Sequence, residues 1–287
     1  MTLPSSLPAA PEPLETHVID NHTHLYSTLE HSGLDIATSL DAAAAAGVIG
    51  VVEVGCDVPS SRLAAELAAA DPRVRAAVAI HPNDAARTFQ RGGLAALDEE
   101  IEQIRALAAL PGVVAVGETG LDYYRTRHPE AQGVQAHSFR AHIELAREAD
   151  LTLVIHDRDA HADILKTLDA VRRPERIVMH CFSGDADFAR ECLDRGFWLS
   201  YPGVVTFGSA GSLREAAKAT PLERILVETD APYLTPKPHR GKPNAPYLLP
   251  HTAAFLADLL EVPLSEFCRQ VTANTEAAYA AKWGGGA

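Results

Sequence analysis

The feature that most constrains the fold is a repeating unit, in which a short apolar run is followed by a polar loop and an amphipathic helical segment. It begins at Val18 and recurs about eight times, at a spacing typical of alternating strands and helices. The apolar runs are rich in Val and Ile and do not alternate with polar residues, as expected of strands buried on both faces. They lie at residues 18–19, 48–54, 74–80, 113–116, 151–155, 177–179, 197–199 and 225–227.

Amphipathic segments between these runs predict the helices that connect parallel strands. They lie at residues 61–70, 94–110, 135–149, 160–168, 187–195 and 213–219. Ser60 or Ser61 and Asp187 are the expected N-caps, because their side-chain oxygens accept hydrogen bonds from free backbone amides. Eight such units fit a closed (β/α)8 barrel, and an open doubly wound sheet fits the same periodicity. The sequence contains no GxGxxG or GK[ST] phosphate loop, which favours the barrel.

Length and composition predict a single α/β domain. The chain has 287 residues, close to the about 250 that one (β/α)8 TIM-type barrel needs, and no composition shift divides it. We assign the barrel to residues 18–283. Residues 1–17 are a Pro-rich lead-in predicted to be disordered, without the basic and apolar regions of a signal peptide. Residues 284–287 form a Gly-rich tail.

Charge and cysteine usage restrict the partners and the compartment. The net charge of -13, from 25 basic and 38 acidic residues, opposes binding to a long nucleic-acid backbone without cations and to an anionic membrane. The sequence contains no run of about 18 apolar residues, so no transmembrane helix is predicted. The four cysteines are far apart and form no CxxC motif, so we expect reduced thiols in a cytoplasmic protein.

Metal-ligating side chains directly follow five of the apolar runs. His22 and His24 are two residues apart, so both imidazoles point to one side of a strand. Four more candidates follow later runs: Glu118, His156, His180 and Asp230. The carboxyl ends of all strands meet on one face of a closed parallel barrel, so we expect these groups to converge. Each alone also fits a structural role, such as an ion pair between Glu118 and Arg125.

Four imidazoles and two carboxylates exceed what one tetrahedral ion with an open position needs. They suit two divalent cations that share a carboxylate and activate water. Glu118 is the expected bridge, because it lies between the two histidine pairs in strand order. We expect Asp230 to ligate one ion and to accept the proton of the attacking water. The mixed ligand set leaves Mg²⁺, Mn²⁺ and Zn²⁺ as candidates.

Further candidates are less specific. His81 follows the third run and is predicted either to contact substrate or to fix its loop with a hydrogen bond. Glu53, in the second run, is expected to support the site or to form a buried ion pair. Cys181 follows His180 directly, and because neighbours on a strand point to opposite faces we expect it in the core rather than as a nucleophile.

A basic loop follows the eighth run, at residues 233–244. It carries Lys237, Arg240 and Lys242 in an otherwise acidic chain. A loop of this kind is usually only solvated. Its position beside the expected site makes Arg240 and Lys242 candidates for holding phosphate oxygens.

These motifs resemble the TatD family of metal-dependent deoxyribonucleases, within the amidohydrolase-like TIM barrels. The matching segments are DNHTH at 20–24, GETGLDYY at 117–124, HCFSG at 180–184, ETDAPYLTP at 228–236 and RGK at 240–242. The resemblance runs from about Val18 to Trp283. It implies a TIM-type barrel, divalent-metal ligands at the six residues chosen above, and phosphodiester hydrolysis on DNA.

Two positions depart from the family pattern. Thr119 stands where the family usually has Ile, which we interpret as a packing change. Ala245 stands before Pro246 where the family usually has Glu, a residue suited to orienting the basic loop. The resemblance therefore carries more weight for metal binding than for substrate orientation.

The leading hypothesis is a monomeric metal-dependent nuclease, an exonuclease that contacts a short single strand or a strand end of DNA. One alternative is an amidohydrolase-like enzyme acting on a small amide, lactone or phosphoester. Many such barrels bridge their metals through a carbamylated lysine, whereas Glu118 occupies that position here. The deaminase glutamate that follows the fifth-strand histidine is also missing, since only Asp157 and Asp159 are found there. The other alternative is a metal-binding scaffold without catalysis.

Overall fold

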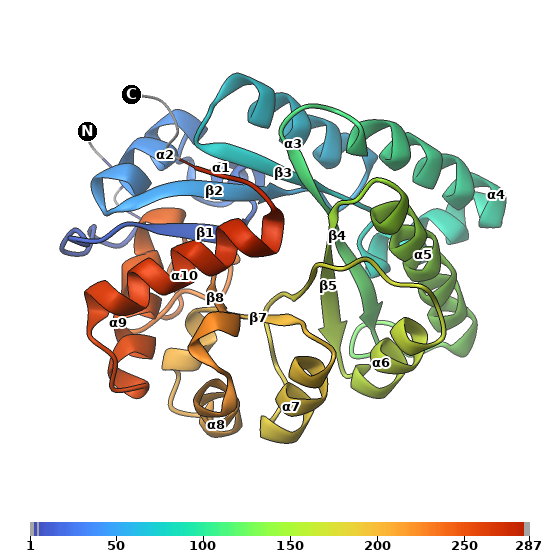
Figure 1. Ribbon diagram of the computed structural model, residues 1–287. Coiled ribbons are helices and arrows are strands. Elements are labelled where there is room, and N and C mark those ends of the chain that lie inside the picture. The colour runs from blue at the N-terminus through green and yellow to red at the C-terminus, as the bar shows by residue number, and fades with distance from the viewer. Residues whose placement is uncertain (1–2, 5, 284–287) are drawn as a thin grey trace. The chain divides into compact units, whose positions relative to one another are not determined.

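The computed structural model describes residues 3–4 and 6–283, so the predicted Gly-rich tail at 284–287 lies outside the described residues. Eight strands form one sheet in the order β1 to β8, which is the chain order (Figure 1). They are β1 (Val18–Thr23), β2 (Val48–Val54), β3 (Val74–Val78), β4 (Val113–Asp122), β5 (Thr152–Arg158), β6 (Ile177–Met179), β7 (Trp198–Tyr201) and β8 (Ile225–Val227). Sequential order with parallel pairing confirms the (β/α)8 TIM-type barrel and excludes a doubly wound sheet, whose strand order reverses.

Helices alternate with the strands as the periodicity predicts. They are α1 (Leu25–Ser32), α2 (Ile36–Ala45), α3 (Val58–Ala70), α4 (Pro82–Ala108), α5 (Pro129–Glu148), α6 (His161–Asp169), α7 (Ala186–Asp194), α8 (Gly211–Ala219), α9 (Leu249–Leu259) and α10 (Leu264–Tyr279). Gly93 has a non-helical φ of 74° and divides α4, so the helix predicted from residue 94 is the second part of α4, and the part from Pro82 was not predicted. Helix α5 begins before its predicted start, because Pro129 occupies a first-turn position where a missing N–H costs nothing. None of the described helices is long and apolar enough to cross a membrane.

The predicted N-caps of two helices are wrong. Asp57 caps α3 by accepting from the Ser60 amide at 2.8 Å, and the Ser60 hydroxyl accepts in return from the Asp57 amide at 3.1 Å. Ser61 instead donates its buried hydroxyl to the Ala79 carbonyl at 3.2 Å. In both helices an aspartate upstream of the predicted cap takes the role.

The second of these helices, α7, is capped by Asp185. Its carboxylate accepts from the amides of Asp187 and Phe188 at 3.1 and 2.9 Å. Asp187, the predicted cap, therefore lies inside the first turn, where its charge still favours the positive end of the helix dipole.

The chain divides into two compact units. Among the described residues, the first comprises those up to residue 53 together with 184–277 and 281–283, and the second comprises residues 54–183 and 278–280. In the first unit β1 and β8 are adjacent, since the Asp230 amide donates to the His22 carbonyl at 3.0 Å and the His24 amide to the Ala231 carbonyl at 2.9 Å. The carboxyl ends of the first and last strands are thereby held together.

The described part of the lead-in differs from the disorder expected for residues 1–17. Leu7 is buried in an apolar cluster that includes Leu34 and Tyr247, and the Tyr247 hydroxyl donates to the Pro8 carbonyl at 2.7 Å. The Leu14 amide also donates to the carbonyl of Ala46 at 3.1 Å. Burial of a leucine and pairing of backbone groups offset the entropy cost of ordering this Pro-rich segment.

In the second unit, the long parallel pair of β4 and β5 forms the frame of the functional residues (Figure 1). The pairing extends from Ala115 opposite Thr152 to Asp122 opposite Arg158, past the runs predicted from the sequence. Gly120 has a φ of 144° and lies so close to β5 that a Cβ atom would meet the His156 carbonyl oxygen at 2.0 Å. Glycine at 120 is therefore required for the close approach of the two strands beside His156.

Candidate metal centre

In the first unit, β1 and the segment after β8 bring together three of the predicted ligands. His22 and His24 lie at the end of β1 with their rings 5.1 Å apart, and both are buried. The Oδ1 atom of Asp230 lies 3.9 Å from Nε2 of His22 and 3.5 Å from Nε2 of His24. Two imidazole nitrogens and a carboxylate oxygen thus converge as the HxH spacing predicts.

A buried hydrogen-bond pair fixes β1 against the start of this ligand segment. Asp20 accepts from the Thr229 amide at 2.9 Å and from the Thr229 hydroxyl at 2.5 Å. Burial raises the pKa of the fully buried Asp20 carboxyl to about 8, although these hydrogen bonds oppose the shift. Because Asp20 and Thr229 are each close in sequence to a ligand, this contact sets the geometry of His22 relative to Asp230.

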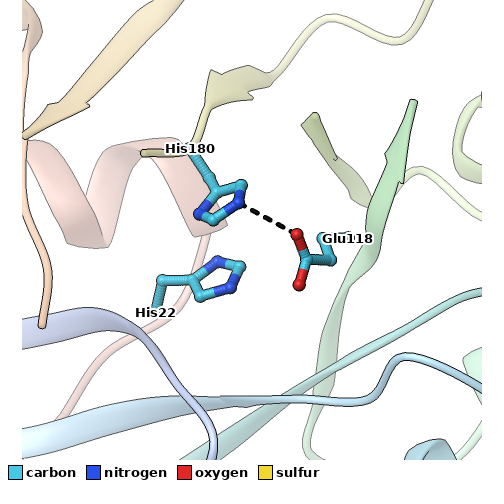
Figure 2. Close-up of side chains that lie close together, drawn as sticks. All are labelled: His22, Glu118 and His180. Carbon is cyan, nitrogen blue, oxygen red and sulfur yellow. Dashed lines mark ion pairs between the residues drawn. The ribbon is translucent and has the colours of Figure 1, made fainter. Parts of the chain in front are cut away.

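In the second unit, Glu118 is surrounded by histidines. Its Oε2 atom lies 2.9 Å from Nε2 of His180, an ion pair drawn in Figure 2, and 3.0 Å from Nδ1 of His156. Nε2 of His81 lies 3.8 Å away. Burial alone would raise the pKa of Glu118, but the histidines outweigh it and hold the pKa well below its usual value. Glu118 is thus a carboxylate anion among imidazoles, as a metal ligand must be.

The opposite side of the His156 ring faces Asp122, whose importance the sequence analysis missed. Nε2 of His156 is buried without a hydrogen bond among the described residues, and Oδ2 of Asp122 lies 3.6 Å from it. Burial lowers the pKa of His156, but Asp122 and Glu118 together raise it above its usual value. Asp122 itself is held by the Asn83 amide at 2.8 Å and the Arg125 backbone amide at 2.8 Å. Asp122 is the last residue of the GETGLD segment, and this position was the sequence feature from which its role could have been predicted.

The structure shows the loop-fixing role that was one of two predicted for His81. Its Nδ1 accepts from the Asn83 backbone amide at 3.1 Å at the start of α4. Burial lowers the pKa of His81 to about 3, so the ring is neutral. Because Nδ1 is an acceptor, the proton is on Nε2, the atom that faces Glu118.

The structure also resolves the expectations for Glu53 and Cys181. Glu53 accepts from the Leu25 backbone amide at 2.7 Å, and burial raises its pKa to about 7. It therefore supports the start of α1, directly after His24. Cys181 was expected in the core but is only half-buried, which corrects that prediction. β6 ends at Met179 and Cys181 has a φ of 45°, so strand alternation does not reach it.

The basic loop of residues 233–244 is held to the end of β8 by Asn244. Its side-chain amide donates to the Thr229 carbonyl at 2.9 Å and to the Tyr233 carbonyl at 2.6 Å. Lys242 is exposed, and the exposed Arg240 guanidinium lies 4.5 Å from the Phe207 ring centroid. Asn244 therefore orients the loop without the glutamate that is usual at the next position.

Buried apolar surroundings explain the two departures from the family pattern. Ala245 is fully buried in the cluster that contains Leu7 and Tyr247 of the same unit, where a glutamate would be costly. Thr119 is buried on β4 opposite Ile155, which fits the interpretation of a packing change.

The donor sets fit divalent cations. In the first unit, ligand atoms of His22, His24 and Asp230 lie within 4.8 Å of one another, and in the second unit those of His81, Glu118 and His156 do so. Imidazole nitrogen and carboxylate oxygen suit Zn²⁺ and Mn²⁺, and buried carboxylates are stable mainly when paired or ligating. The buried Nε2 atom of His156, which makes no hydrogen bond among the described residues, is a further nitrogen that could ligate a metal ion.

Comparison with known proteins gives a consistent result over nearly the whole chain. The sequence model of the TatD related DNase family matches residues 19–280. The chain is 42% identical over 269 residues to a metal-dependent hydrolase named TatD from Mycobacterium tuberculosis, covering 93% of this chain and 99% of the relative. It is 38% identical to the metal-dependent hydrolase YcfH of Escherichia coli K12, covering 90% and 93%.

A solved structure agrees with this result. The crystal structure of YjjV, a TatD homologue from Escherichia coli K12, superposes with a TM-score of 0.81 at 26% sequence identity. The match covers 92% of this chain and 98% of YjjV. The match therefore includes residues of both compact units.

Proposed function

Because the chain belongs to the TatD-related DNase family, we propose that it is a metal-dependent hydrolase that cleaves phosphodiester bonds of DNA from strand ends. The observation that carries the proposal is the pair of imidazole–carboxylate clusters at the carboxyl ends of strands, one in each unit. The carboxyl ends of the strands are where barrel enzymes place their active sites.

We propose that the two clusters form one dinuclear centre. The support is the sequence pattern, which places a candidate ligand at the carboxyl end of five strands of one parallel barrel, together with the family match over residues 19–280. The ligands would be His22, His24, Glu118, His156, His180 and Asp230. Glu118 is the proposed bridge, because it is the carboxylate that lies within 3.0 Å of two histidine nitrogens of its own unit.

Bound divalent ions would supply Lewis-acid stabilisation of the phosphoryl oxygens and lower the pKa of a water molecule. The protein then needs a group to take the proton of the attacking water. Asp230 is suited to this role, because its Oδ1 lies beside both His22 and His24 and its side chain keeps 14% exposure. The hydrogen bond from the Asp230 amide to the His22 carbonyl fixes the backbone that carries this carboxylate.

His81, Arg240 and Lys242 are proposed substrate contacts. Neutral His81 has its proton on Nε2, a position from which it donates to a phosphoryl oxygen. Arg240 and Lys242 are exposed on the loop that Asn244 ties to the end of β8, and their cationic groups suit the phosphates beside the scissile bond. With a net charge of -13, the protein is expected to contact a few nucleotides at a strand end rather than a long duplex. The proposed acting form is the monomer.

The direct test is cleavage of end-labelled single-stranded DNA by protein stripped of metal and then supplied with Mg²⁺, Mn²⁺ or Zn²⁺. The His156→Ala and Asp230→Ala variants should lose metal-dependent shortening from the labelled strand. His137→Ala is the matched control, because His137 is an exposed histidine that pairs with Asp98. Metal binding without DNA cleavage, combined with turnover of esters or lactones, would refute the proposal.

A further inference from the structure

A tyrosine–guanidinium stack lies on the surface of the second unit. Tyr124 is 49% exposed, and the guanidinium carbon of Arg158 lies 4.1 Å from its ring centroid. The guanidinium of Arg127 lies 6.0 Å from the same centroid, and its Nε donates to the Tyr124 carbonyl at 3.3 Å. An open aromatic ring with two cationic neighbours is the chemistry that binds a base and its phosphate.

The stack is connected to the ligand-bearing strands by register. Arg158 comes two residues after His156 on β5, so both side chains leave the same side of the strand, about 7 Å apart along it. Asp122 at the end of β4 pairs with Arg158, and the next amide, of Tyr123, donates to the Arg158 carbonyl at 2.9 Å. The stack is thus one nucleotide-sized step from the His156 ring.

The loop that carries the stack is held in place. The Asp122 carboxylate accepts from the Arg125 amide at 2.8 Å, and the Asp122 carbonyl accepts from the Thr126 amide at 3.1 Å. The Tyr123 hydroxyl donates to Asp163 on α6 at 2.8 Å. The stack therefore needs little ordering when a ligand binds, which lowers the entropy cost of binding.

The charge of this segment differs from that of the whole protein. Residues 123–129 read YYRTRHP, with two arginines, a histidine and no acidic residue, in a chain of net charge -13. Acidic residues surround this segment: Asp122 and Glu130 flank it, Asp157 and Asp159 flank Arg158, and Asp163 accepts from the Tyr123 hydroxyl. The few cationic groups of this segment lie among acidic residues, which favours an anionic ligand that is short rather than extended.

We propose that Tyr124, Arg127 and Arg158 bind the nucleotide next to the scissile phosphodiester of a single-stranded nucleic acid. The base stacks on the open part of the Tyr124 ring, and the arginines contact its phosphate. Stacking of this kind accepts any base, because every base has an aromatic face. This inference rests on the proposed nuclease function and adds the subsite that holds the strand.

The test uses metal-loaded enzyme and compares Tyr124→Ala with Tyr124→Phe. Removal of the ring should raise KM for a labelled oligonucleotide about 5- to 150-fold, the range for loss of one base–aromatic stack. The kcat for the same oligonucleotide should fall less than KM rises, because the ring contacts the neighbouring base and not the reacting phosphate. Tyr124→Phe keeps the stacking face and should retain the wild-type KM within about twofold. Thermal melts establish that both variants are folded.

An abasic substitution identifies the subsite by position. A series of phosphorothioate oligonucleotides, each lacking one base, is measured by fluorescence anisotropy. At one position, removal of the base should weaken binding by the wild type. Binding by Tyr124→Ala should not weaken further there, because this variant already lacks the tyrosine ring on which the base stacks.

The matched control is another arginine–aromatic stack in the protein. In the first unit, Arg224 lies 4.5 Å from the Trp198 ring, at the amino-terminal ends of β7 and β8. Arg224→Met should leave KM unchanged, whereas Arg158→Met should raise it. If oligonucleotides are cleaved and Tyr124→Ala retains the wild-type KM, the subsite is wrong and the nuclease stands. If the wild type neither binds nor cleaves oligonucleotides, both proposals fail.

Discussion

His142 provides a quantitative prediction about stability and pH. This histidine of α5 is fully buried, and its Nε2 accepts from the Ile80 backbone amide at 3.1 Å. Its Nδ1 therefore carries the proton and donates to the Ser138 carbonyl at 2.8 Å. Both ring nitrogens are used by the neutral imidazole. Protonation would replace the acceptor at Nε2 with a second donor facing the Ile80 N–H.

Burial lowers the pKa of His142 from 6.5 to about 4. The ring is neutral in the folded protein between these values, whereas in the unfolded chain it is protonated below pH 6.5. The unfolded state then binds one more proton, so the free energy of unfolding falls by about 1.4 kcal/mol for each pH unit below 6.5. The loss is about 2 kcal/mol at pH 5 and reaches about 3 kcal/mol near pH 4, while nothing is lost above pH 6.5.

The assay is urea unfolding of the wild type and His142→Gln at pH 7.5 and at pH 5, with a chelator present throughout. The wild type should lose about 2 kcal/mol more than the variant between the two pH values, because all other titrating groups are shared. The control is His137→Gln, which replaces an exposed histidine on the same helix. Its loss of unfolding free energy between the two pH values should match that of the wild type. Equal losses in the wild type and His142→Gln would show that His142 charges readily when folded and would refute the reasoning.

Three further perturbations test the packing and the metal clusters. Ala245→Glu should lower the free energy of unfolding by about 3–5 kcal/mol, because it places a charge in an apolar cluster; an unchanged urea midpoint would contradict this. Leu7→Ala should cost about 2–3 kcal/mol in the same assay if the lead-in is part of the fold, and nothing if the segment is disordered in solution. Metal at about 100 times its Kd should stabilise the wild type by about 2.7 kcal/mol, detected as a rise in Tm that Glu118→Gln reduces.

The candidate ligands at the ends of strands could be predicted from the sequence, because the carboxyl ends of all strands in a parallel barrel lie on one face. The spacing of His22 and His24 fixed a shared side of β1, and the structure brings both beside Asp230. The position of Glu118 after the fourth run likewise led to a carboxylate within 3.0 Å of His156. These predictions depend on strand direction and alternation, which local sequence encodes.

The contacts that support the ligands and the lead-in could not be predicted in this way, because they arise from tertiary packing between residues far apart in sequence. The Asp122 carboxylate is positioned by Asn83, which is 39 residues away in sequence, and no local pattern indicates that pair. The burial of Leu7 depends on Tyr247 across most of the chain. Cys181 was placed in the core by extending strand alternation past the true end of β6, a boundary that depends on backbone conformation.

Titration of metal into the stripped protein, followed by shortening of end-labelled single-stranded DNA, tests the dinuclear nuclease most directly. Two divalent ions should bind per chain, and the rate of shortening should reach its plateau at about two equivalents. Glu118→Gln, which alters the proposed bridge, should bind fewer ions and lose cleavage in parallel. A protein that binds two equivalents and leaves both ends of the DNA intact would contradict the account.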